Sequence, residues 1–231
     1  MRTLSSLILV LSSACGALVG SGNVSSQDRL VGAFTRVSVD GALKVSISPG
    51  ARSVSVRTDD NLLAAISATV HGDTLELGLV PDTAIARSTT LEATVSDDAL
   101  EGLTVAGASS VTASATPSGA FWLTVSGASH AALDGIAPGS LTVDVSGAST
   151  ATLKGAARSG ALRLTGASAV DLRELSLETA QLDLSGGSAL RARVSAEVLG
   201  TMSGASTATI LGNPTVNVSQ SEGARLELGP L

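Results

Sequence analysis

Aromatic side chains are almost absent from this 231-residue chain, which has no tyrosine, one tryptophan and two phenylalanines. Protein interiors are packed nearly as densely as organic crystals, so a core without large side chains can fill only a narrow space. Hydrophobic residues nevertheless make up 44% of the chain. We therefore expect a thin core of Val, Leu, Ile and Ala, and the interior of a β-solenoid meets this condition.

Cysteine, histidine and clustered basic residues are also scarce. Cys15 is the only cysteine, and the two histidines lie far apart, which excludes intramolecular disulfides and the usual transition-metal site. The formal net charge is -6 and no basic cluster is present, which argues against nucleic acid and anionic membrane surfaces as partners. Phosphate-cradling Gly-Lys-Ser/Thr and calcium-binding Gly-Gly-x-Gly-x-Asp motifs are missing. We expect no cofactor, no metal and no nucleic-acid partner.

The N-terminus has the pattern of an export signal. Arg2 precedes an apolar run over residues 4–14 that is too short to span a bilayer, which predicts a signal peptide over residues 1–14. Cys15 follows Ser12-Ser13-Ala14, an arrangement that resembles a bacterial lipobox, in which the cysteine is lipidated and becomes the mature N-terminus. Ser12 departs from the leucine that is favoured there. The alternative is an ordinary signal peptide cut after Ala14 or a few residues later.

The N-terminal pattern also predicts the location of the protein. We expect an exported protein of the outer membrane, the periplasm or the cell surface, anchored as a lipoprotein through Cys15 and meeting the membrane only through that lipid. Residues 15–33, rich in Gly, Ser and Asn, are expected to form a flexible tether. The folded domain is predicted over residues 34–231, and its opening stretch has period-2 alternation interrupted by Gly, Pro and Asp.

A short phrase, Ser-Gly-Ala-Ser with small variations, recurs six times between residues 106 and 206. Its glycines are separated by steps of 18 to 20 residues, which is typical of stacked repeats. They are Gly107, Gly127, Gly147, Gly166, Gly186 and Gly204. Glycine accepts a positive φ angle, and at a solenoid corner a side chain would collide with the coil above. We interpret these glycines as the structural corners of the repeat.

Apolar residues keep fixed places around each corner. Around Gly127 they are Leu123 and Val125 before the glycine and Ala131 and Leu133 after it. Each period thus holds two short strands with one apolar face, joined at the corner. A less regular third side is expected to be filled by Phe121, Ile136, Leu141, Leu175, Leu177, Val198 and Leu199. The predicted fold is an all-β, single-stranded parallel β-helix of about 20 residues per coil with a less regular N-terminal β portion.

The serine two places after each glycine recurs in the same column. The six are Ser109, Ser129, Ser149, Ser168, Ser188 and Ser206. One hypothesis is a polar recognition strip for a glycan or another surface. The alternative, which we favour, is that these hydroxyls bond to corner backbone groups and to each other, as short polar side chains do at turns.

Charged residues fall into columns that alternate in sign. Asp144, Arg163 and Asp183 stand three places before successive glycines, and Asp171 and Arg191 stand five places after. Opposite charges across adjacent strands stabilise each other by about 0.2–1 kcal/mol per pair. We interpret these carboxylates as partners in surface ion pairs rather than as catalytic or metal-binding groups.

One alternative is that the protein is an enzyme, because parallel β-helices include polysaccharide lyases and hydrolases. Such chemistry needs clustered acids, or acids with a basic residue, in a groove that aromatic side chains usually line. Here only one of Phe121 and Trp122 can face outward. His130 has Ser110 on a neighbouring coil and Asp134 four residues on. The strand ladder offers no oxyanion hole beside them, so we predict no catalytic residue.

The order of motifs resembles a known family. The opening Phe34-Thr-Arg-Val-Ser-Val-Asp-Gly-Ala42, the Asp60-Asn61 turn, the Gly72-Asp-Thr-Leu75 hairpin and the repeated Ser-Gly-Ala-Ser phrase are similar to the putative auto-transporter adhesin, head GIN domain family (DUF2807). The resemblance covers about residues 34–228. It implies a bacterial envelope protein, often a lipoprotein, folded as a right-handed β-helix related in shape to pectate lyases. It implies no established reaction and no catalytic residues.

Three functions follow as hypotheses. We favour a non-enzymatic cell-envelope β-helix that acts as an adhesin or as a surface or periplasmic binding or scaffolding module, with a glycan or another envelope component as partner. The second is a carbohydrate-active enzyme of pectate-lyase-like fold, which a groove with unpaired acids beside an exposed Trp122 would favour. The third is a self-assembling structural element, since the ends of a solenoid can stack.

Overall fold

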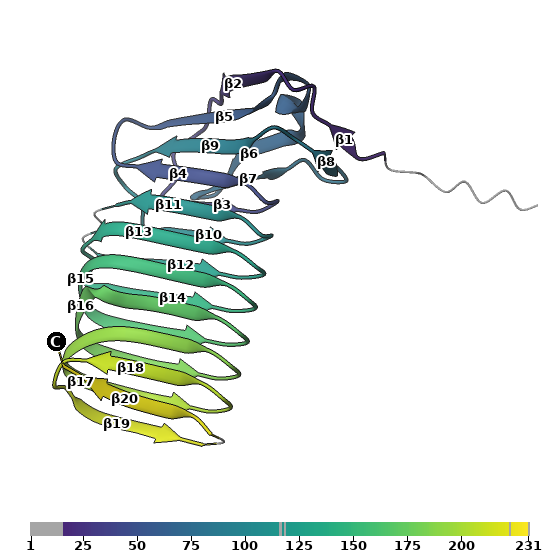
Figure 1. Cartoon of the computed structure of the whole chain (residues 1–231). Coiled ribbons are helices and arrows are strands. Elements are labelled where there is room, and N and C mark those ends of the chain that lie inside the picture. The colour runs from purple at the N-terminus through teal and green to yellow at the C-terminus, as the bar shows by residue number, and fades with distance from the viewer. Residues whose placement is uncertain (1–15, 116, 118, 222, 231) are drawn as a thin grey trace, which may run out of the picture.

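The computed structural model describes residues 16–230 except 116, 118 and 222, and the described chain is almost entirely β-sheet (Figure 1). A parallel β-solenoid forms most of the molecule, and an N-terminal cap closes one end. The one helix among the described residues is the short 3-10 helix η1 (Asp60–Ala65). This confirms the predicted fold class of a parallel β-solenoid with about 20 residues per coil.

Two sides of the solenoid, A and B, meet at the repeated glycines. Side A contains β3 (Arg36–Val39), β10 (Gly102–Val105), β12 (Ala120–Val125), β14 (Ser140–Val145) and β19 (Thr215–Gln220). Side B contains β4 (Lys44–Ser48), β11 (Ser110–Ser114), β13 (His130–Ile136), β18 (Thr207–Leu211) and β20 (Arg225–Gly229). Three long strands run from side B across the third side to side A: β15 (Thr150–Leu164), β16 (Ala169–Leu184) and β17 (Ala189–Met202).

The coils stack in register, so equivalent apolar residues form continuous inward columns. Val143 lies opposite Leu162, and Leu162 lies opposite Leu182 on the next coil. Alternation along each strand turns every second side chain inward, and burying one such side chain contributes at most about 1.5–3 kcal/mol. The residues expected to fill the third side are buried. Leu199 is the exception, at 38% exposed, because its neighbour Val198 takes the inward position.

The cap extends the two ladders and then reverses strand direction. β7 (Thr74–Leu79) lies parallel to β3, and β9 (Leu91–Ser96) lies parallel to β4. Antiparallel strands complete the cap: β5 (Ser53–Asp59) pairs with β9, and β6 (Ile66–His71) forms a hairpin with β7. The less regular N-terminal portion is thus continuous with the solenoid core.

The segment expected to be a flexible tether is instead ordered in two places. β2 (Val24–Asp28) pairs antiparallel with β5, and β1 (Leu18–Val19) pairs with β8 (Ile85–Arg87). Long-range hydrogen bonds hold the rest: the Asn61 side chain accepts from the backbone N–H of Ser21 (2.9 Å) and donates to the Val19 carbonyl (2.9 Å). These partners lie about 40 residues away, so local composition did not reveal them.

The predicted signal peptide, residues 1–14, and Cys15 lie outside the described residues. Across the described part of the chain, no helix has both the length and the apolar character needed to cross a membrane.

Candidate functional site

The six repeat glycines stack directly on one another at the corner between sides A and B. Their φ angles are positive, between 64° and 78°. A Cβ atom on Gly147 would lie 2.5 Å from the carbonyl oxygen of Gly127 on the preceding coil. That oxygen accepts a hydrogen bond from the backbone N–H of Ala148 (2.9 Å). The corner is therefore backbone stacked on backbone, with no space for a side chain at the glycine.

The repeat serines point into the protein rather than out of it. All six are at most 2% exposed, so the hypothesis of a recognition strip is wrong for this column. Ser149 Oγ accepts a hydrogen bond from the backbone N–H of Ser129 (3.3 Å), and Ser109 Oγ accepts one from that of Leu43 (3.3 Å). The hydroxyls of the other four have no partner in the structure; they are Ser129, Ser168, Ser188 and Ser206. The predicted hydrogen bond between the serine hydroxyl and the corner backbone is thus present for two of the six repeat serines.

Of the alternating charges, Asp183 and Asp171 form surface contacts, the second with a partner different from the expected one, whereas Asp144 has no ion pair among the described residues. Arg163 Nε lies 3.8 Å from Asp183 Oδ2, as the column order predicts, and both side chains are 63% exposed. Asp171 lies opposite Arg191 in the ladder, but its carboxylate binds Arg173 on its own strand, at 2.6–3.0 Å. These hydrogen bonds from Arg173 are the main reason that the pKa of Asp171 lies below its ordinary value. Residues two apart on a strand share a face, which explains the switch.

His130 contacts a hydroxyl on the next coil rather than Ser110 or Asp134. Its Nδ1 lies 2.7 Å from Thr150 Oγ1, the residue opposite it on the next coil. This is the one hydrogen bond of the ring in the described structure. Within the same residues, no group of three His, Cys, Asp or Glu side chains is arranged to hold a metal ion.

Trp122 faces outward on side A and is 41% exposed, whereas Phe121 is fully buried. The indole stands beside a hollow of about 360 Å³ that is bounded on its other side by Arg36. Its remaining lining residues are Val37, Thr74, Gly102, Leu103, Thr104 and Thr124. No carboxylate lines this hollow, so the unpaired acid that would have favoured an enzyme is not beside Trp122.

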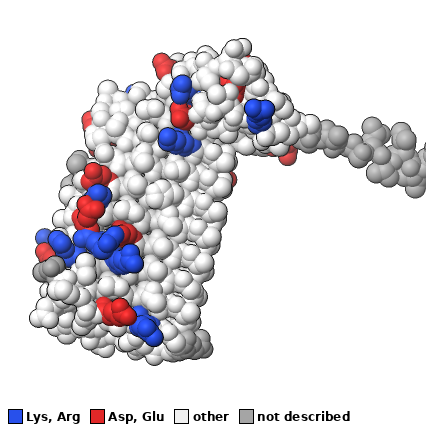
Figure 2. Space-filling model, in the orientation of Figure 1, with Lys and Arg blue, Asp and Glu red and all other residues white. Residues whose placement is uncertain are grey.

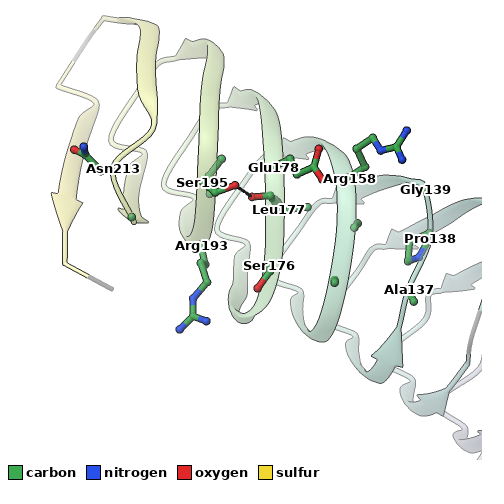
Figure 3. A pocket seen from close by; sticks show the side chains of 14 residues that line it. Ala137, Pro138, Gly139, Arg158, Ser176, Leu177, Glu178, Arg193, Ser195 and Asn213 are labelled. Carbon is green, nitrogen blue, oxygen red and sulfur yellow. Dashed lines mark hydrogen bonds between the residues drawn. The ribbon is translucent and has the colours of Figure 1, made fainter.

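A larger groove, here called the axial groove, runs along the third side (Figure 3). Its volume is about 740 Å³, within the ~300–1,000 Å³ of small-molecule sites. It crosses successive coils from Ala137 to Asn213, which at ~4.8 Å per coil gives a length of about 19 Å. Small residues make the depression: Ala137, Gly139, Ala156, Ser176, Ser195 and Gly212.

Three charged side chains stand at the axial groove. Arg158 and Glu178 lie side by side on one wall, and Arg193 lies near Ser176 on the other (Figure 3). None of the three is in an ion pair with another described residue. Figure 2 shows charged side chains gathered along the edge that carries the third side, while most of the remaining visible surface is uncharged. The groove combines an apolar floor, including Leu177 and Val194, with charges of both signs.

The axial groove does not follow from the sequence pattern. The third side lacks the periodicity of the two ladders, and its outward residues are small rather than chemically conspicuous. The available signal was the clustering of Gly and Ala at residues 135–139 and 155–161. Where outward side chains are small on successive coils, the surface is hollow.

The fold and its surfaces define a parallel β-solenoid with a groove along one side. The family described as putative auto-transporter adhesin, head GIN domain, matches residues 33–214, and the chain belongs to this family. No curated protein matches the sequence.

Several solved bacterial structures have the same fold. A putative adhesin from Bacteroides fragilis aligns with a TM-score of 0.85 at 16% identity, covering 93% of this chain and 100% of that one. A putative adhesin from Parabacteroides merdae aligns with a TM-score of 0.71 at 13% identity, covering 92% and 99%. A putative lipid binding protein from Parabacteroides distasonis aligns with a TM-score of 0.68 at 15% identity, covering 93% and 100%. At these identities the likeness establishes the fold alone.

Proposed function

We propose that this protein is a non-enzymatic binding module of the bacterial cell envelope, an adhesin-type solenoid that holds its partner in the axial groove. The observation that carries the proposal is the groove itself. It is long, has an apolar floor, and carries Arg158, Glu178 and Arg193, which have no ion-pair partner among the residues that the structure describes. Unpaired charges at the rim of an apolar groove can orient a ligand whose body fills the floor.

The proposal includes the anchor that the sequence predicts. Export through residues 1–14 and lipidation at Cys15 would hold the solenoid at a membrane by its capped end. The adhesin family supports an exported or surface protein, and the name of the lipid binding protein among similar structures is compatible with an apolar groove. A Cys15→Ser variant should move the protein from the membrane to the soluble fraction. A wild-type protein that is already soluble would contradict the anchor.

The groove can be tested by filling it. Ala156 is an exposed alanine on its wall, and Ala148 is an exposed alanine at the opposite corner. Beads that carry the mature chain should retain intact bacterial cells under flow. Ala156→Trp should lower retention several-fold, while the matched Ala148→Trp should leave it unchanged. Equal retention by both variants, or none by the wild type, would reject the groove as the adhesive site.

The absence of catalysis needs its own measurement. No carboxylate lines the hollow at Trp122, and Glu178 is the one carboxylate at the axial groove, whose lining has no aromatic side chain. Incubation with a panel of acidic and neutral polysaccharides should release no soluble sugar. Turnover of any of them would replace this proposal with a carbohydrate-active enzyme.

A further inference from the structure

The hollow at Trp122 is built by three residues on successive rungs of side A. Gly102 of β10 lies opposite Arg36 of β3 on one side and opposite Trp122 of β12 on the other. Because Gly102 has no side chain, the two large side chains face each other across it. The Arg36 guanidinium carbon lies 5.3 Å from the centroid of the indole, within the range of a cation–π contact.

The one charged residue that lines the hollow is basic, although the whole chain carries a net charge of -6. This residue is Arg36, and its side chain is 46% exposed. Arg36 forms an ion pair with the carboxylate of Asp73, which is 55% exposed, at 3.6 Å, beyond normal hydrogen-bond length. Such an exposed pair contributes little, so a ligand anion can compete for the guanidinium.

Hydroxyl groups complete the lining. Thr104 and Thr124 stand opposite each other on adjacent rungs, face outward, and make no hydrogen bond through their hydroxyls within the described structure. Thr74 lies on the far side of Arg36, opposite it in the ladder. The Thr74 hydroxyl donates a hydrogen bond to the Asp73 carboxylate (3.1 Å), which leaves those of Thr104 and Thr124 free to donate and accept. A ligand here meets a flat apolar ring, a planar cation and these two hydroxyls.

We propose that this hollow is a subsite for a carboxylate-bearing sugar, such as a uronic acid residue of a glycan. The indole would pack against the apolar face of the sugar ring, and Arg36 would bind its carboxylate through two parallel N–H donors. The hydroxyls of Thr104 and Thr124 would meet the ring hydroxyls. A neutral sugar leaves the guanidinium unused, and a small anion leaves the indole unused.

The sheet at this place disfavours a peptide. β10 is paired on both sides, with β3 and β12, and β12 is paired with β10 and β14. No free strand edge is available to which an extended peptide could add. The subsite lies on side A and the axial groove on the third side, so each of the two proposals can fail without the other.

The single tryptophan makes the proposal directly measurable, since the chain has no tyrosine and its intrinsic fluorescence reports on this one site. A purified oligogalacturonate should change the Trp122 emission in a saturable way, while the fully methyl-esterified oligomer should bind at least about tenfold more weakly. Arg36→Gln should weaken binding of the acid form by about ten- to a hundredfold. The charge-matched control Arg191→Gln, on side B, should leave it unchanged.

Trp122→Leu removes the fluorophore, so its binding is followed by calorimetry and its fold by circular dichroism. It should lose most of its affinity for the acid form while remaining folded. Equal binding of the acid and methyl-ester forms would reject the role of Arg36. Equal binding of a polyglutamate peptide would reject a sugar ligand, and absence of binding to the acid form would overturn the proposal.

Discussion

The carboxylate of Asp59 binds Thr89 through two of its hydrogen bonds. It accepts one from the backbone N–H of Thr89 (2.7 Å) and one from the Thr89 hydroxyl (2.8 Å). A third comes from the backbone N–H of Gly22 (2.8 Å). Asp59 is fully buried, so one side chain joins the N-terminal arm, the end of β5 and the segment before β9. This contact explains why residues near Gly22 are ordered rather than tethered loosely.

The cap should therefore lose stability in acid. The backbone N–H of Thr89 is the largest influence on Asp59; burial opposes it, yet the net effect holds the pKa of Asp59 below its ordinary value of 3.8. A group whose pKa is lower in the folded state stabilises the fold above its unfolded pKa. That contribution is lost as the pH falls through the lower, folded pKa. The urea midpoint should fall between pH 7 and pH 3.

Asp59→Asn isolates this contribution, because Glu92 and Asp171 also have lowered pKa values and add to the acid sensitivity. The amide cannot accept all three hydrogen bonds, so the variant should be less stable than the wild type at pH 7. Its midpoint should then fall less between pH 7 and pH 3. Parallel pH profiles for the two proteins would contradict the role assigned to Asp59.

Repetition is what made the solenoid predictable from the sequence. Each corner glycine marks the same place in its coil, so the inward columns, the register and the outward position of Trp122 all follow from counting from that glycine. The cap has no such repeat. Its order depends on contacts such as that of Asp59 with Gly22, whose partners lie far apart in the chain and leave no local pattern.

The surfaces were less predictable than the core for a related reason. A serine after a glycine looks like an exposed turn residue, but the corner continues the strand alternation and turns Ser149 inward. The axial groove arises because the outward side chains on the third side are small. A single small residue in the sequence, such as Ala156 or Gly212, does not indicate a groove. Only the stacking of coils reveals that such residues line one surface.

Two adjacent glycines should respond in opposite ways to the same substitution. Gly186 has a φ of 71°, and a Cβ there would lie 2.7 Å from the carbonyl oxygen of Gly166. Gly186→Ala should destabilise the protein by about 1–3 kcal/mol from backbone strain, and by more if the coil must shift. At Gly187 a Cβ would lie 3.9 Å from the same oxygen, an ordinary contact.

Gly187→Ala should therefore be stabilising, by about 0.4–1 kcal/mol, because it removes freedom from the unfolded chain. The other five corners already have alanine at this position: Ala108, Ala128, Ala148, Ala167 and Ala205. Urea unfolding of the two variants beside the wild type measures both effects. A Gly186→Ala variant as stable as Gly187→Ala would show that the corner is not held by close backbone stacking.

Replacing a buried repeat serine by alanine should change the stability of the protein differently, depending on whether the serine hydroxyl has a hydrogen-bond partner. Ser188 Oγ is buried without a hydrogen bond, and leaving such a group unmet costs about 1–3 kcal/mol. Ser188→Ala should be neutral or stabilising. Ser149→Ala removes the acceptor of the Ser129 N–H and should cost about 0.5–1.5 kcal/mol. Equal losses for both in urea unfolding would mean that the hydroxyls bond along the whole column.

The two arginines near Asp171 can be ranked by their effect on its titration. Arg173 donates hydrogen bonds to the carboxylate, whereas Arg191, on the next coil, acts only through its charge. Charge alone is weakened by solvent and salt at an exposed site, while a charge-assisted hydrogen bond favours the ionised form more strongly. In a carboxyl NMR titration, Arg173→Gln should raise the pKa of Asp171 clearly more than Arg191→Gln does. Addition of salt should reduce the effect of Arg191 more than that of Arg173. The reverse order would mean that the cross-coil pair expected from the column pattern is the dominant one in solution.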